Sequence, residues 1–119
     1  MQESDRGELV ASAKVGERPG GRAALHRPDL ALISPEGRAL AVEIELSVKA
    51  PRRLAAICRG WARARHVSHV CYIADAAPAR AVSRAIAETR AEDRITVLPR
   101  GDSASLIAVE RGEISDVVF

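Results

Sequence analysis

The chain has little of what zinc-binding, secreted and membrane proteins depend on. It contains two cysteines, Cys58 and Cys71; both lie among apolar neighbours, and neither belongs to a CxxC or a mixed Cys/His spacing. A structural zinc site is therefore not expected, and both cysteines are predicted to be small buried side chains in a reducing compartment. No apolar run is long enough to span a membrane, and the polar, acidic residues 1–8 lack the form of a secretory signal. We expect a cytoplasmic protein that does not engage a membrane.

The motifs of several enzyme classes are also missing. The sequence has no GxSxG, no glycine-rich phosphate loop and no paired Cys/His cluster. It shows no internal repeat and no linker, and its 119 residues suffice for one domain with a real core. Because 47% of the residues are hydrophobic, a disordered chain is excluded.

Lysine is scarce as well. Lys14 and Lys49 are the only lysines, and the other 16 basic residues are arginines. Arginine binds phosphate oxygens bidentately, which favours a nucleic-acid partner. A GC-rich genome would produce the same bias together with the abundance of alanine, so composition alone leaves both explanations open.

Residues 27–46 form the most informative segment. Apolar stretches flank Pro35-Glu36-Gly37, which suits the three-residue loop of a β-hairpin. If Ser34 pairs with Arg38, paired numbers sum to 72, so Asp29 faces Glu43, and Glu45 lies one diagonal step away. The alternating apolar residues then point to the other face: Leu30, Leu32, Leu40, Val42, Ile44 and Leu46.

Three carboxylates on one face need a compensating positive charge, because like charges directly opposite one another destabilise a sheet. A divalent cation would supply it, since Mg²⁺ prefers carboxylate oxygens with room for water and can activate a water for attack on phosphate. The alternative is a solvated polar face that Arg27, Arg38 or Lys49 neutralises. Both interpretations stay open.

Helix and strand patterns alternate after the hairpin. Pro51 suits the first turn of a helix whose buried stripe is predicted to be Leu54, Ile57, Cys58 and Trp61. On the opposite side Arg52, Arg59 and Arg63 follow spacings of seven and four, a row that suits either a phosphate backbone or solvent.

A strand covered on both faces is predicted at 68–74, because this run is almost continuously apolar. Asp75 then caps a second helix to about residue 91, with inward-facing residues at Val82, Ala85, Ile86 and Thr89. A short strand at 94–98 and a closing hairpin of 106–109 with 114–118 complete the pattern, within a closing segment 104–119.

The first 25 residues are the least defined part of the chain. Residues 8–14 suit a short strand or helix, and 15–21 are predicted to be a Gly/Pro loop. We therefore expect residues 1–119 to form a single compact α/β domain. Its core would be 26–98, arranged as a sandwich around a mixed central sheet: a β-hairpin, then helix, strand, helix, strand.

Pro28-Asp29, one hairpin, and then Glu43-Ile44-Glu45 resemble the signature of the PD-(D/E)xK nucleases. Together with Arg27 and Lys49, the segment 26–74 is similar to nuclease-like domains of actinobacterial plasmid replication-relaxation proteins. This resemblance implies a restriction-endonuclease-like fold. It also implies Mg²⁺-dependent hydrolysis of DNA phosphodiester bonds, linked to the replication of a plasmid or mobile element.

Site residues follow from the resemblance by position. Asp29, Glu43, the carbonyl of Ile44 and Glu45 would hold Mg²⁺, or Mn²⁺ as a substitute. Glu45 stands where the family carries lysine, although some restriction endonucleases of the superfamily also have glutamate there. Lys49 would then supply the catalytic ammonium from a migrated position, or be an ordinary surface lysine.

DNA contacts are the remaining implication, and they would come from five arginines: Arg27, Arg52, Arg53, Arg59 and Arg63. Sequence specificity would need a homodimer or a partner protein. His26, just before the motif, would contact phosphate, transfer a proton or simply hydrogen-bond at a strand entrance. Loss of the lysine at position 45 and the small size favour a different class, a catalytically inactive nuclease fold kept for DNA binding or protein interaction.

Overall fold

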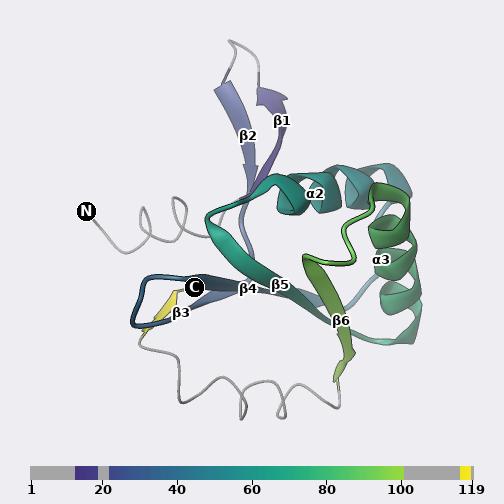
Figure 1. Cartoon of the computed structure of the whole chain (residues 1–119). Helices are drawn as coiled ribbons and strands as arrows, with labels where there is room; N and C mark the ends of the chain where they lie inside the picture. Colours follow the sequence, from purple (N-terminus) through teal and green to yellow (C-terminus); the bar gives the residue numbers. More distant parts are fainter. Residues whose placement is uncertain (1–12, 19–21, 101–115, 119) are drawn as a thin grey trace.

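The computed structural model describes residues 13–18, 22–100 and 116–118. A five-stranded sheet in the order β6-β5-β4-β3-β7 is its centre, and β1 with β2 forms a separate two-stranded ribbon (Figure 1). The strands are β1 (Ala13–Arg18), β2 (Arg22–His26), β3 (Leu30–Ile33), β4 (Ala39–Glu45), β5 (Val67–Ala74), β6 (Ile95–Pro99) and β7 (Asp116–Val118), and the helices are α2 (Pro51–Arg63) and α3 (Ala76–Thr89).

The hairpin β3–β4 forms in the predicted register. Leu30 pairs with Val42, and the N–H of Ser34 donates to the carbonyl of Arg38 at 2.9 Å, so paired numbers sum to 72. Gly37 takes a φ of 84°, the left-handed conformation that the loop requires. The prediction of a hairpin around Pro35-Glu36-Gly37 is confirmed.

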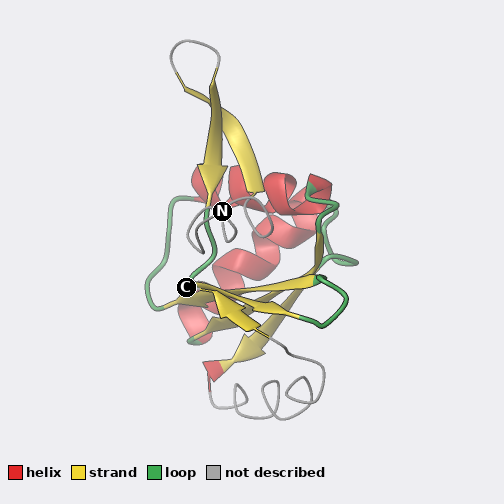
Figure 2. Cartoon of the chain, turned by 90° about the vertical axis from the view of Figure 1, so that its left-hand side faces the viewer, coloured by secondary structure: helices red, strands yellow, loops and turns green. Residues whose placement is uncertain are grey.

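The sheet is mixed, as expected. β3 runs antiparallel to β4 and β7, whereas β4, β5 and β6 are parallel neighbours joined through α2 and α3. Right-handed crossovers that proceed in one direction across a sheet place their helices on the same face. Both helices accordingly cover one side of the sheet and contact each other (Figures 1 and 2). An α/β domain with a mixed sheet is therefore observed.

The core lies between this face and the helices. The predicted stripe of α2 is buried: Leu54, Ile57, Cys58 and Trp61. It packs with β5 and with three of the four predicted inward residues of α3, which are Val82, Ala85 and Ile86; the fourth, Thr89, is half-buried. Residues 70–74 of β5 are all buried, as predicted for a strand covered on both faces.

The amino-terminal expectation was wrong in part. Residues 15–18, predicted as loop, continue β1, which pairs with β2 in a region taken to be poorly defined. The ladder contains an irregularity between Lys14 and Gly16, and such bulges break the alternation by which strands are recognised. The ribbon projects beyond α2 in both views (Figures 1 and 2).

One other prediction needs correction. Asp75 occupies the N-cap position of α3 but makes no capping hydrogen bond with its side chain. At the carboxyl end, 116–118 is a strand, and it pairs with β3 of the main sheet. The strand predicted at 106–109 lies outside the described residues, so the closing hairpin stays a prediction. No helix in the described ranges is long and apolar enough to cross a membrane.

Candidate functional site

Glu43 is the centre of a buried hydrogen-bond cluster that we call the Glu43 cluster: Glu43, His26, Trp61 and Tyr72. Its side chain is 3% exposed and lies on the helix-facing side of β4. The Oε2 atom accepts from Trp61 Nε1 at 3.3 Å and from the Tyr72 hydroxyl at 3.2 Å, and His26 Nε2 donates to the same oxygen. One carboxylate thus links β2, β4, α2 and β5.

The surroundings of Glu43 are those of a buried negative charge. Burial first, and then the charge of Glu43, raises the pKa of the Tyr72 hydroxyl far above its ordinary value. The same two causes raise the pKa of the Cys58 thiol to about 11. An unpaired carboxylate in such a place would be very costly, whereas three donors offset the loss of hydration.

Glu45 has its own partner. It is 5% exposed, and Lys49 Nζ donates to its Oε1 at 2.5 Å. The lysine that the resemblance placed near the motif does therefore approach it. It does so as the ion-pair partner of Glu45, four residues away along the chain.

Asp29 lies outside the ladder. The pairing of β3 with β4 ends at Leu30. The prediction that Asp29 faces Glu43 as its ladder partner is therefore wrong. Its exposed carboxylate bends toward β4, where Oδ2 accepts from the N–H of Ile44 at 2.6 Å. Asp29 therefore extends the hairpin by one hydrogen bond and stays beside the Glu-Ile-Glu motif.

These residues do not fit a Mg²⁺ site in the present arrangement. Within the described ranges, no three Asp, Glu, His or Cys side chains form a group that could hold a metal ion. Mg²⁺ requires several carboxylate or water oxygens in near-octahedral geometry, and Glu43, Glu45 and Asp29 are each bound to an internal donor. Metal binding stays a prediction.

The alternative of a solvated acidic face is wrong for Glu43 and Glu45, which are buried, but its suggestion that Lys49 neutralises the motif is confirmed at Glu45. The face that carries Glu43 and Glu45 lies beneath the helices, with Ala39 and Ala41 fully buried beside them. His26 is the partner of Glu43, and Lys49 is the partner of Glu45. Of the three described residues that the sequence suggested as partners, which were Arg27, Arg38 and Lys49, only Lys49 pairs with one of these two carboxylates. Of the three roles open to His26, hydrogen bonding at a strand end is the one seen.

Helix α2 carries four of the five predicted arginines, and Arg27 lies between β2 and β3. All five predicted DNA-contacting residues are exposed: Arg27, Arg52, Arg53, Arg59 and Arg63. Lys49 is paired with Glu45, but the segment 50–74 contains five arginines and no aspartate or glutamate. No acidic residue within this segment is therefore available to neutralise the arginines, which suits a polyanion.

A cleft of about 420 Å³ borders the same surface. It lies between β1 and the first half of α2 and is lined by Val15, Ala50, Arg52, Arg53, Ala56 and Ile57. Sequence reasoning missed this neighbour of the arginines because residues 15–18 of β1 were predicted to be loop. The nearest signal was Pro19-Gly20-Gly21, a turn sequence between two short segments of mixed polarity.

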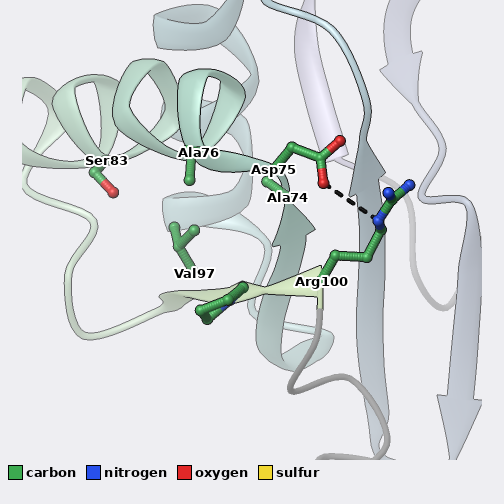
Figure 3. Close-up of a pocket in the computed structure, with 8 residues that line it drawn as sticks. Ala74, Asp75, Ala76, Ser83, Val97 and Arg100 are labelled. Carbon is green, nitrogen blue, oxygen red and sulfur yellow. Dashed lines mark ion pairs between the residues drawn. The ribbon is translucent and has the colours of Figure 1, made fainter.

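A second hollow, about 550 Å³, lies where β5 and β6 end (Figure 3). Asp75 Oδ1 pairs there with Arg100 Nε at 3.2 Å, and the same side chain makes no capping hydrogen bond to α3. Val97 and Ser83 line the same hollow. It contains none of the residues predicted from the motif.

Comparison with known proteins identifies no relative: no family model, curated protein or solved structure matches the chain. Function must therefore be inferred from the chemistry of the site.

Proposed function

We propose that this domain binds DNA through phosphate contacts from the outer face of α2, as a nuclease-like module whose acidic motif supports its own fold. The observation that supports this proposal most directly is a row of three exposed arginines, Arg52, Arg59 and Arg63, within a segment that has no acidic residue. Spacings of seven and four keep all three on one side of a helix. Each arginine that neutralises a phosphate releases counterions and adds affinity that does not depend on sequence.

The acidic motif supports the non-catalytic form of this proposal. Glu43 and Glu45 are buried and already bound to His26 and Lys49, so their charges are used within the protein. The order of hairpin β3–β4, α2 and β5 is compatible with a restriction-endonuclease-like scaffold, which is part of the proposal.

Binding of a short duplex, followed by fluorescence anisotropy in EDTA over a range of salt, tests the proposal. Arg52→Ala with Arg59→Ala should weaken binding roughly tenfold and lower the slope of log K against log salt by roughly two, since each contact contributes about 0.9. The matched control is Arg80→Ala with Arg84→Ala, two exposed arginines of α3, which should bind like the wild type. Equal losses in both double variants, or none in either, would contradict a site on α2.

A second candidate is the Mg²⁺-dependent nuclease that the motif implies. One observation favours it: Asp29 and Lys49 both lie against the Glu43-Ile44-Glu45 segment. Activity would require Glu43 and Glu45 to exchange their present donors for an ion. Incubation of supercoiled DNA with Mn²⁺ or Mg²⁺ separates the candidates. Nicking that EDTA and Asp29→Ala abolish would establish the nuclease, whereas binding in EDTA without any cleavage supports the module.

A further inference from the structure

The ribbon β1–β2 stands apart from the main sheet and projects past α2 (Figures 1 and 2). Its ladder runs from Ala13↔His26 to Arg18↔Arg22, a length of roughly 17 Å at about 3.4 Å per residue. An isolated two-stranded hairpin is marginally stable in water. Contacts at its base must therefore hold it in place.

Both strands are anchored at that base. On β1, Ala13 is fully buried, and the carbonyl of Lys14 lies so close to α2 that a Cβ at Gly60 would be 2.7 Å from its oxygen. On β2, His26 donates to Glu43 and meets the Trp61 ring edge-on, with centroids 5.9 Å apart. The direction of the ribbon relative to α2 is thus defined by packing on one strand and by a buried hydrogen bond on the other.

Positive charge continues from α2 onto the ribbon. Lys14 is exposed on β1. Its neighbour Val15 and the helix residue Arg52 line the same cleft. At the far end of the ladder two arginine positions, Arg18 and Arg22, are directly paired. Basic residues therefore occur at both ends of the ribbon, against one acidic residue in 13–26.

We infer that the ribbon enters a groove of double-stranded DNA while the arginines of α2 hold the adjacent phosphate backbone. This inference rests on the function proposed for α2 and adds the substrate class. The major groove of B-DNA is about 12 Å wide and about 8.5 Å deep, dimensions that admit a two-stranded β-ribbon. Single-stranded DNA presents no groove, and the major groove of an RNA duplex is too narrow. The preferred substrate is therefore duplex DNA.

The test compares a duplex and a single strand of equal length by fluorescence anisotropy, using the full chain. Arg18→Ser with Arg22→Ser should weaken duplex binding roughly tenfold and leave single-strand binding within about twofold, because only the duplex offers a groove. Arg52→Ala with Arg59→Ala should weaken both. Gly60→Ala, whose added Cβ would meet the Lys14 carbonyl at the base of the ribbon, should reproduce the duplex-specific loss. Circular dichroism verifies that each variant is folded.

The two proposals fail in different ways. If the ribbon double variant binds both DNAs like the wild type while the α2 double variant loses both, the ribbon has no role and the α2 surface stands. If the ribbon variant loses duplex and single strand equally, its arginines act as general charge and groove entry is overturned. If the α2 double variant binds both DNAs normally, the proposed function fails, and the inference that rests on it fails too.

Discussion

At the scale of single residues, Glu43 shows how one buried carboxylate can be tolerated in a small core. Three donors from three different elements meet a single oxygen, and each would lose a partner if the carboxylate were removed. A buried donor without a partner costs about 1–3 kcal/mol. The carboxylate of Glu43 therefore stabilises the fold mainly because its removal would leave three donors without an acceptor.

Glu43→Gln should therefore destabilise the domain whether or not metal is present. We expect its free energy of unfolding in urea to fall by about 1–3 kcal/mol, because a neutral amide oxygen accepts more weakly than a carboxylate. Glu88→Gln, an exposed substitution on α3, is the control and should change little.

Wild-type stability should also be the same in Mg²⁺ and in EDTA, since an ion bound to the native state would raise it. Stabilisation by Mg²⁺ that disappears in Glu43→Gln would show that the carboxylate serves an ion after all.

His69 makes stability depend on pH. Burial and the nearby Arg94 guanidinium lower the pKa of this imidazole below its ordinary value of 6.5, and its Nε2 lies 2.7 Å from the Thr96 hydroxyl. The folded state therefore binds a proton less readily than the unfolded state. The contribution of His69 to stability is complete above the pKa that this residue has in the unfolded state. It is lost as the pH falls toward the lower pKa of the folded state.

Urea unfolding at neutral and mildly acidic pH measures this effect. The wild type should lose stability on acidification, and His69→Gln, which cannot titrate, should lose less. An identical loss in both proteins would assign the pH dependence to other groups.

At the scale of elements, the alternation of β4 predicted which residues share a face but not which face is covered. The acidic face is the one that the helices cover, as right-handed crossovers in one direction would place them, and Ala41 on the same face belongs to the core shared with α2 and α3. The opposite face retains Ile44 with 42% of its surface exposed. Local pattern thus established the register of the hairpin, whereas burial depended on the path of the chain after it.

The partners of the acidic residues were partly predictable. Lys49 lies four residues from Glu45, a spacing that sequence reasoning could test directly. The donors to Glu43 come from 17, 18 and 29 residues away, and no local pattern connects them. The ribbon was missed for a similar reason, because its stability depends on docking against Gly60 and not on the regular alternation of a half-buried strand.

Gly60→Ala tests that docking. In an ordinary helix this change stabilises by about 1 kcal/mol, but here the new Cβ would meet the Lys14 carbonyl at 2.7 Å, so we expect a net loss of about 1–3 kcal/mol. Gly16→Ala is the matched control, because nothing lies within 4 Å of its added Cβ. Urea unfolding measures both, and hydrogen exchange of β1 amides locates the change. A Gly60→Ala protein as stable as Gly16→Ala would mean that β1 is not held by this contact.

At the scale of the whole molecule, each of the two layers contains one cysteine, so the reactivity of the two thiols can be followed for the helices and for the sheet. Cys58 is fully buried in α2, and Cys71 lies in β5 at 2% exposure. Burial raises the pKa of both thiols, with Glu43 adding to the effect at Cys58. Because the thiolate is the reactive form, both are protected by lack of access and by retention of the proton.

Labelling with a thiol reagent, located by peptide mass spectrometry, should therefore require opening of the structure. We expect Cys58 and Cys71 to react at the same slow rate in mild urea, since α2 and the sheet share one core and should open together. Fully denatured protein, which should react at once at both positions, is the control. Faster labelling of Cys58 would show that α2 leaves the sheet independently. The ribbon is anchored to α2 through Gly60 and Trp61, so it would then lose the defined orientation that entry into a DNA groove requires.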